Sequence, residues 1–393
     1  MSDTNGAPAH SFLHKVPANG PKRMLSLDGG GIRGLITIEI LARLEALLRE
    51  ARGGDESFVL SDYFDYVGGT STGAVIASGI ALGMSTAQLR DFFVQGATAM
   101  FVKAPFFRQW YYRNVDGLLS AKLRDVVGKD RELGDPDLRT LLLLVMKNAT
   151  TDSPWPLSNN PKARYNDPNQ DGCNSKLPLW QLIRASTAAP TYFAPAVVQV
   201  GTKEFVFVDG AISVYNNPAF ILFLMATLPE YRLEWPVGED QLLLVSVGTG
   251  AIGQASANLK PSQMTLLYNA RMIPSALIDA ALVEQDLLCR VFGRCRFGDS
   301  IDGEIGDLLE REDRQVASTA PAFQPKKFTY VRYNPQLTRK GLDELGLKDI
   351  ATEDVQPLDS PRHVAELEQV GLAYAKQIQM ADLGPFDPTR GGA

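Results

Sequence analysis

Histidine is scarce in this sequence, with only His10, His14 and His363 among 393 residues. The first two belong to a leader that contains Gly, Pro and Ser, and the third lies in a polar C-terminal segment. Because histidine is the most frequent general base beside a nucleophilic serine, a Ser-His-Asp triad is not expected here. A nucleophilic serine in this chain would need a carboxylate as its base.

Cysteine is equally scarce. The three cysteines, Cys173, Cys289 and Cys295, are an odd number and show no C-x-x-C spacing. This pattern argues against a disulfide framework and against a cysteine-based metal site. We expect reduced cysteines that pack in the interior, and we expect neither a metal nor a cofactor.

The sequence also lacks a basic excess and a long apolar run. It has 39 Lys and Arg against 45 Asp and Glu, a net charge of −6, which argues against a nucleic-acid polymer as partner. It has no stretch of about 18 apolar residues, and residues 1–22 have no apolar segment typical of a signal peptide. We therefore expect a soluble protein of the cytoplasm.

The sequence does contain a serine elbow, Gly69-Thr70-Ser71-Thr72-Gly73. An apolar stretch, residues 63–67, precedes it, and a run of small and apolar residues, 74–82, follows it. In a G-x-S-x-G elbow the serine sits on a tight turn between a strand and a helix, with glycines where a Cβ would collide with the backbone. The motif predicts Ser71 as a nucleophile, although among 34 glycines it is weak evidence without its context.

A glycine loop stands upstream, in Asp28-Gly29-Gly30-Gly31-Ile32-Arg33-Gly34. A strand-like segment, 23–27, precedes it, and a helical stripe of apolar residues, 35–49, follows it. Consecutive glycines let backbone N–H groups turn toward an anion at the start of a helix. The anion is either a phosphate group or the oxyanion of an acyl-transfer intermediate.

The phosphate alternative rests on the G-x-G-x-x-G spacing of residues 29–34, which occurs again at 248–253. A dinucleotide-binding loop also needs an acidic residue about 20 positions later, at the end of an apolar strand. Asp55 and the glutamate after it have roughly that spacing but stand in a polar stretch. The oxyanion alternative is favoured, because Ser71 supplies the nucleophile that it requires.

Asp209 is the best candidate for the base. It closes the apolar, strand-like segment 205–208 and is followed by Gly210. The end of a strand is where a sheet presents residues at its carboxyl edge. The alternative is an ordinary turn aspartate that bonds to its own backbone. With Ser71 and the glycine loop present, we interpret Asp209 as catalytic.

Three motifs in this order resemble the patatin-like phospholipase family. They are DGGGIRG at 28–34, GTSTG at 69–73 and DGA at 209–211. The resemblance covers most of residues 20–255. Three ordered motifs are far more specific than one of them alone.

The resemblance implies roles for individual residues. Ser71 and Asp209 would form a catalytic dyad. The oxyanion hole would consist of the backbone amides of Gly29, Gly30 and Gly31, with Arg33 supporting that loop. No metal or cofactor takes part in such a mechanism.

Alternating strand and helix patterns predict an α/β fold with a mainly parallel sheet covered on both faces. The resemblance implies the same class, a three-layer α/β/α arrangement with a C-terminal extension of helices and strands. We divide the chain into a flexible leader at 1–20, a catalytic core at 21–255, an extension packed on the core at 256–385 and a frayed tail at 386–393.

The resemblance also implies an activity. It is that of a lipid acyl hydrolase of the phospholipase A or lysophospholipase type, which cleaves carboxylic esters of membrane glycerolipids through an acyl-enzyme. The partner would be phospholipid or another ester lipid at a membrane surface, approached from the aqueous side.

Two alternatives to a constitutive hydrolase stay open. Some bacterial relatives are effectors of antiphage defence that a cyclic nucleotide activates, which would add a small-molecule activator. A non-catalytic nucleotide-binding or storage protein is the alternative from a different class, although storage alone would not need Ser71 and Asp209.

Residues 101–112 contain six aromatic residues together with Lys103 and Arg108. They fit either an interfacial lid or a connection between helices that packs in the core. The core alternative is favoured, since aromatic side chains are usually buried. The oligomeric state is not predicted.

Overall fold

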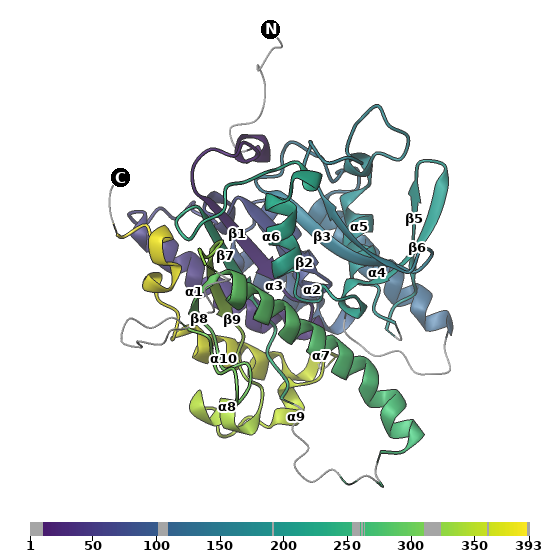
Figure 1. Cartoon of the computed structure of the whole chain (residues 1–393). Helices are drawn as coiled ribbons and strands as arrows, with labels where there is room; N and C mark the ends of the chain where they lie inside the picture. The colour runs from purple at the N-terminus through teal and green to yellow at the C-terminus, as the bar shows by residue number, and fades with distance from the viewer. Residues whose placement is uncertain are drawn as a thin grey trace.

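The structure is a computed structural model (Figure 1), which describes residues 11–100, 109–190, 192–253, 260, 262, 264–309, 324–359 and 361–390. Within these ranges, the side chains of residues 97–100, 109–116, 266, 267, 269–271 and 274 are not described. Of the helices in the described ranges, none has both the length and the apolar character needed to cross a bilayer.

Nine strands of the described chain form one sheet. They are β1 (Lys22–Leu27), β2 (Tyr66–Thr70), β3 (Leu141–Asn148), β4 (Ser153–Ser158), β5 (Ala196–Val200), β6 (Lys203–Asp209), β7 (Leu242–Val247), β8 (Arg294–Phe297) and β9 (Thr329–Tyr333). Hydrogen-bonded neighbours run β5-β6-β3-β2-β1-β7-β9-β8, and β4 also pairs with β3. The neighbouring pairs among β3, β2, β1, β7, β9 and β8 are parallel. The pairs β3–β4, β3–β6 and β5–β6 are antiparallel. The expectation of a mainly parallel sheet is confirmed.

Helices cover both faces of this sheet. They are α1 (Gly34–Ala51), α2 (Thr72–Ala81), α3 (Thr86–Met100), α4 (Gln109–Val127), α5 (Leu179–Ser186), α6 (Ala219–Thr227), α7 (Leu266–Phe292), α8 (Arg339–Glu344), α9 (Thr352–Val355) and α10 (Val364–Ala375). Helices α1, α2 and α5 pack on one face, with α3, α4 and α10 against their outer sides. Helices α6 and α7 pack on the other face (Figure 1). The predicted three-layer α/β/α class is confirmed.

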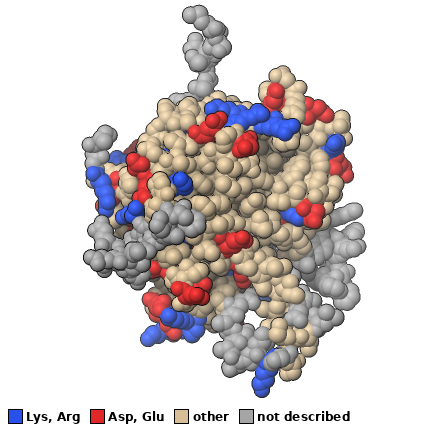
Figure 2. Space-filling view, viewed as in Figure 1, with Lys and Arg blue, Asp and Glu red and all other residues tan. Residues whose placement is uncertain are grey.

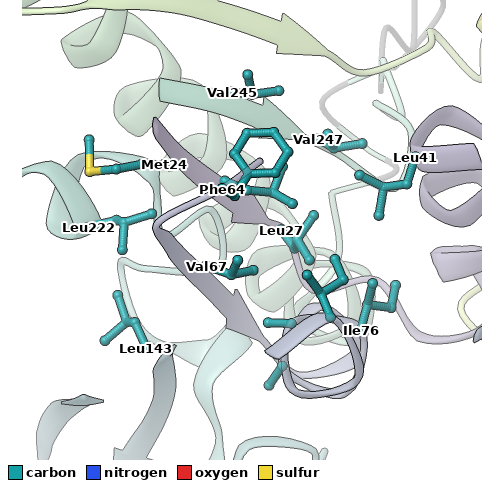
Figure 3. Close-up of a cluster of buried hydrophobic side chains, with 14 of the residues drawn as sticks. Met24, Leu27, Leu41, Phe64, Val67, Ile76, Leu143, Leu222, Val245 and Val247 are labelled. Atoms are coloured by element: carbon teal, nitrogen blue, oxygen red, sulfur yellow. The ribbon is translucent and has the colours of Figure 1, made fainter. Parts of the chain in front are cut away.

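The core lies between the sheet and its helices. Residues 141–146 of β3 are an unbroken buried apolar run, as expected for a strand that is covered on both faces. Figure 3 shows Leu222 of α6 and Leu41 of α1 on either side of β1. Both side chains are fully buried, so burial of apolar surface on both faces holds the carboxyl edge of the strands in place.

The extension after residue 255 contributes directly to the sheet. Strand β9 pairs with β7, and β8 pairs with β9, both in parallel. Residues before and after the predicted boundary at 255 therefore contribute strands to the same sheet. The extension continues the sheet as well as covering it.

The ends of the chain differ from the predicted flexible leader and frayed tail. A 3₁₀ helix, η1 (Phe12–Lys15), lies within the leader, and its Phe12 is buried. The Lys15 ammonium donates to the carbonyl of Phe64 at 2.8 Å. At the other end Asp387 is buried. Buried residues thus occur in both predicted segments, and at the N-terminal end Phe12 and Lys15 contact the core.

Candidate active site

Ser71 lies on the turn between β2 and α2. Its backbone has φ 53° and ψ −121°, a conformation that an ordinary side chain rarely adopts. A Cβ on Gly69 would lie 2.1 Å from the carbonyl oxygen of Gly73, and one on Gly73 would lie 2.2 Å from that of Leu27. Both glycines of the motif are required by these close approaches. The elbow predicted from the sequence is present in the structure.

Asp209 meets Ser71 at this turn. The Ser71 Oγ donates to Asp209 Oδ2 at 2.7 Å, and the Ala211 amide donates to Asp209 Oδ1 at 2.7 Å. The bond from Ala211 orients the carboxylate and leaves its other oxygen, Oδ2, for the Ser71 hydroxyl. The two sequence candidates are therefore within hydrogen-bond reach of each other, as a nucleophile and its base must be.

The pairing of β3 explains how these residues meet. Strand β4 occupies one edge of β3 over residues 143–148, so β2 and β6 must share the other edge. The last residue of β2, Thr70, lies opposite Val145, and Asp209 lies opposite the next residue, Met146. Strands β2 and β6 thus lie end to end along the same edge of β3, which brings Asp209 next to the end of β2. The sequence-based picture of Asp209 at the end of a strand is right, but that strand is antiparallel to β3.

Burial tunes Asp209 toward the role of a base. Its side chain is only 2% exposed, and this desolvation raises its pKa from 3.8 to about 6. The hydrogen bonds from Ala211 and Ser71, and the positive charge of Arg184, oppose the rise. A carboxylate with a pKa near 6 is ionised at neutral pH, yet it accepts a proton more readily than an exposed aspartate.

Ser186 holds the backbone of the turn at Ser71. Its hydroxyl accepts a hydrogen bond from the Ser71 backbone N–H at 2.9 Å and donates one to the Val145 carbonyl at 2.6 Å. Ser186 is fully buried at the end of α5. It stabilises the strained turn by satisfying a buried donor. No spacing in the sequence indicates this contact.

The glycine loop lies beside Ser71. A Cβ on Gly29 would come within 3.2 Å of the Ser71 Cβ. The Gly29 amide already donates to the Asn216 carbonyl at 3.0 Å. The amides of Gly30 and Gly31 have no hydrogen bond to another described residue. Of the three predicted oxyanion donors, Gly30 and Gly31 are therefore the ones available for an incoming oxygen.

The second glycine loop, 248–253, packs on the first. Thr249 Oγ1 donates to the Gly29 carbonyl at 3.1 Å, and a Cβ on Gly30 would lie 2.0 Å from the same Oγ1. The buried Arg33 donates from Nη1 to the Gly250 carbonyl at 3.4 Å. The repeat of the G-x-G-x-x-G spacing thus serves close packing between two loops. Arg33 links the two loops through this hydrogen bond.

Burial and two acidic groups act on Arg33. Desolvation lowers its pKa to about 10, and the charges of Asp279 and Asp28 oppose this change. Asp279 belongs to α7, so this helix passes near the glycine loop. Arg33 therefore stays cationic at neutral pH and adds positive potential beside the loop.

Neither described histidine takes part in the bond to Ser71. His14 bonds to the Ser11 carbonyl, and His363 lies 3.4 Å from both Asp354 and Glu366. All three cysteines are buried and unpaired. The described residues contain no cluster of His, Cys, Asp and Glu suited to a metal ion.

The prediction for residues 101–112 falls largely outside the described structure. Residues 101–108 are not described, and residues 109–112 begin α4 within the stretch whose side chains are not described. The choice between a lid and core packing therefore stays a prediction.

Comparison with known proteins supports one family. Residues 25–223, about half of the chain, match the family described as Patatin-like phospholipase. The chain is 35% identical to a cGAMP-activated phospholipase of Vibrio cholerae, with 62% of this chain and 67% of that protein covered.

Two further relatives agree. A cGAMP-activated phospholipase of Escherichia coli is 31% identical, with 62% of this chain and 65% of that protein covered. Patatin-T5 of Solanum tuberosum is 28% identical, with 59% and 61% covered. The chain thus spans about two thirds of the length of these relatives. It belongs to the patatin-like phospholipase family, a family of lipid ester hydrolases.

Proposed function

We propose that this protein hydrolyses carboxylic esters of membrane glycerolipids, as a phospholipase A or lysophospholipase, with Ser71 as nucleophile and Asp209 as base. The observation that carries the proposal is the 2.7 Å hydrogen bond between Ser71 and the buried carboxylate of Asp209. The strained elbow at Ser71 and the adjacent open amides of Gly30 and Gly31 support it.

The first step forms an acyl-enzyme. Ser71 Oγ attacks the ester carbonyl carbon while its proton passes to Asp209. The negative charge that develops on the carbonyl oxygen is stabilised by the amides of Gly30 and Gly31. The tetrahedral intermediate then collapses, and the alcohol leaves with the proton held by Asp209.

The second step releases the fatty acid. Water attacks the acyl carbon and gives a proton to Asp209, and the same amides stabilise the second tetrahedral intermediate. Its collapse breaks the bond to Ser71 Oγ, which recovers the proton. The protein returns to its starting state with one ester bond hydrolysed.

The test is release of fatty acid from mixed phospholipid vesicles by the wild type, Ser71→Ala and Asp209→Asn. Folding of all three is checked by their melting temperatures. Loss of activity in both variants supports the dyad. An active Ser71→Ala variant, or a wild type that is silent under every condition, would contradict it and favour a binding or storage role.

A small-molecule activator is the second candidate function. The relatives from Vibrio cholerae and Escherichia coli are both named cGAMP-activated phospholipases. By this similarity we propose that a cyclic dinucleotide gates hydrolysis here also, in a cytoplasmic protein that meets the membrane from the aqueous side. The vesicle assay is repeated with cGAMP. Equal rates with and without it would contradict gating.

A further inference from the structure

Helix α7 exposes an apolar face to solvent. The exposed fractions of Ile273, Leu277 and Val283 are 52%, 65% and 49%. Ala276 and Ala280 are exposed as well. Counted from Ile273, these five residues stand at positions i, i+3, i+4, i+7 and i+10, which places them on one face of a helix. We call them the α7 face.

One flank of α7 turns toward the active site. Asp279, three positions after Ala276 and four before Val283, is half-buried at the edge of the α7 face, and its charge raises the pKa of Arg33 in the glycine loop. The helix also contacts η5 (Gly210–Ile212), the turn that follows Asp209. Figure 1 shows α7 crossing the front of the molecule. The α7 face is therefore the outer side of an element that borders the site.

Other exposed apolar side chains lie around the same site. Ile212 and Val214, just after Asp209, are 44% and 48% exposed. Leu358 is 42% exposed, and its carbonyl accepts a hydrogen bond from the Ile32 amide of the glycine loop at 3.1 Å. Three segments far apart in sequence thus bring apolar side chains to the surroundings of Ser71.

Charge is sparse on this surface. The five residues of the α7 face are all uncharged, and two acidic residues adjoin them, the half-buried Asp279 and the exposed Glu284, four positions after Ala280. In Figure 2 most of the surface in this view is uncharged, with a few acidic residues near its centre. An apolar surface of this kind usually marks an interaction site, and here the contact would rest on burial of apolar groups rather than on charge.

We propose that the α7 face docks onto a lipid surface and so presents the active site to its substrate. This inference rests on the proposed function, in which the ester lies in a bilayer. A bilayer on this face would supply the ester to the neighbouring site, which a second copy of the chain would not. Because no basic side chain belongs to the α7 face, docking needs no anionic lipid.

The test measures binding of protein to phosphatidylcholine vesicles by co-sedimentation. All proteins carry Ser71→Ala, so that no lipid is consumed. Adding Leu277→Asp or Ile273→Asp is expected to weaken binding about tenfold or more, since each change places a charge where an apolar group was buried in lipid. A tenfold rise in salt is expected to leave binding unchanged, because no ion pairs are involved.

The matched control is Val237→Asp. Val237 is 45% exposed and lies in the loop before β7, at the amino edge of the parallel strands and far from Ser71. This variant is expected to bind as the Ser71→Ala parent does. Melting temperatures confirm that each variant is folded, as expected for substitutions at exposed positions.

The outcomes separate the two proposals. Failure of the parent to bind vesicles, or equal binding by the Leu277→Asp variant, would overturn docking by the α7 face. If sedimentation velocity shows a dimer that Leu277→Asp dissociates while vesicle binding persists, the face is an interface between copies. Intact binding together with a wild type that hydrolyses no lipid, with or without cGAMP, would instead refute the proposed function and leave docking in place.

Discussion

Asp28 and Arg332 form a buried, two-pronged ion pair at the start of the glycine loop. Arg332 Nη1 lies 2.9 Å from Asp28 Oδ1, and Nη2 lies 2.5 Å from Oδ2. Nη1 also donates to Ser246 Oγ at 2.7 Å. Arg332 belongs to β9, so the C-terminal extension holds the first residue of the loop that carries the proposed oxyanion donors.

The first prediction concerns this pair. Arg332→Lys keeps the charge but cannot reproduce the fork of two parallel bonds, so the glycine loop loses its anchor. We expect kcat on a water-soluble ester to fall about tenfold with little change in KM. Arg332→Met leaves a buried carboxylate unpaired and is expected to lower the free energy of unfolding by about 3–5 kcal/mol.

Arg294→Lys is the control for this pair. Arg294 bonds to Glu239 from the neighbouring strand β8, but both side chains are about one third exposed. We expect at most about 1 kcal/mol and unchanged kcat. Equal effects of Arg294→Lys and Arg332→Lys on kcat would refute the positioning role of Arg332.

The second prediction is a pH dependence of the rate. Burial raises the pKa of Asp209 to about 6, and only the ionised carboxylate can take the serine proton. The kcat/KM on a soluble ester should therefore fall about tenfold per pH unit below about pH 6 and level off above it. A profile that stays flat from pH 5 to pH 8 would exclude Asp209 as the base.

The third prediction concerns stability. The folded protein keeps the Asp209 proton up to a pKa of about 6, while the unfolded chain releases it near 3.8. Stability from this group is therefore present at low pH and is lost as the pH rises from about 4 to about 6. Asp209→Asn does not titrate, so its stability relative to wild type should rise over this range by up to about 3 kcal/mol. Urea unfolding at several pH values measures the difference, and a constant difference would contradict the raised pKa.

The fourth prediction tests the loop contact at Gly30. A Cβ there would lie 2.0 Å from Thr249 Oγ1 and 2.4 Å from Thr249 Cβ, so Gly30→Ala must displace the loop. We expect kcat to fall on the order of 10²–10³, as for loss of an oxyanion donor.

Two further variants complete the Gly30 test. Adding Thr249→Gly removes the obstructing side chain and should restore part of the activity. Gly303→Ala, at a site with no heavy atom within 4 Å of the new Cβ, should have no effect. Full activity of Gly30→Ala would show that the loop does not need this close packing.

Much of the site could be predicted because its parts are local in the sequence. The elbow at Ser71 depends on glycines two positions away, and the structure shows the backbone contacts that require them. Asp209 was found because it ends an apolar strand, and it does meet Ser71. Short-range steric rules leave a visible pattern in the residues themselves.

Other features depend on contacts between distant segments. Gly29 reads like its two neighbours in the sequence, yet its amide is engaged by the Asn216 carbonyl. The residues at 11–20 read as a leader, yet Phe12 is buried against the core. Neither outcome follows from local composition, because each depends on a partner far along the chain.

Local sequence predicts the serine elbow, the candidate base, the glycine loop and the α/β class, since each rests on local periodicity or on glycine at a fixed spacing. Three features become visible only in the folded protein. Strand β6 pairs with β3 in the antiparallel sense and ends beside β2. Ser186 accepts a hydrogen bond from the Ser71 amide, and Arg332 forms an ion pair with Asp28. The physical reason is that strand pairing and buried ion pairs join residues far apart in the chain. Their energy depends on geometry that no single stretch of sequence contains.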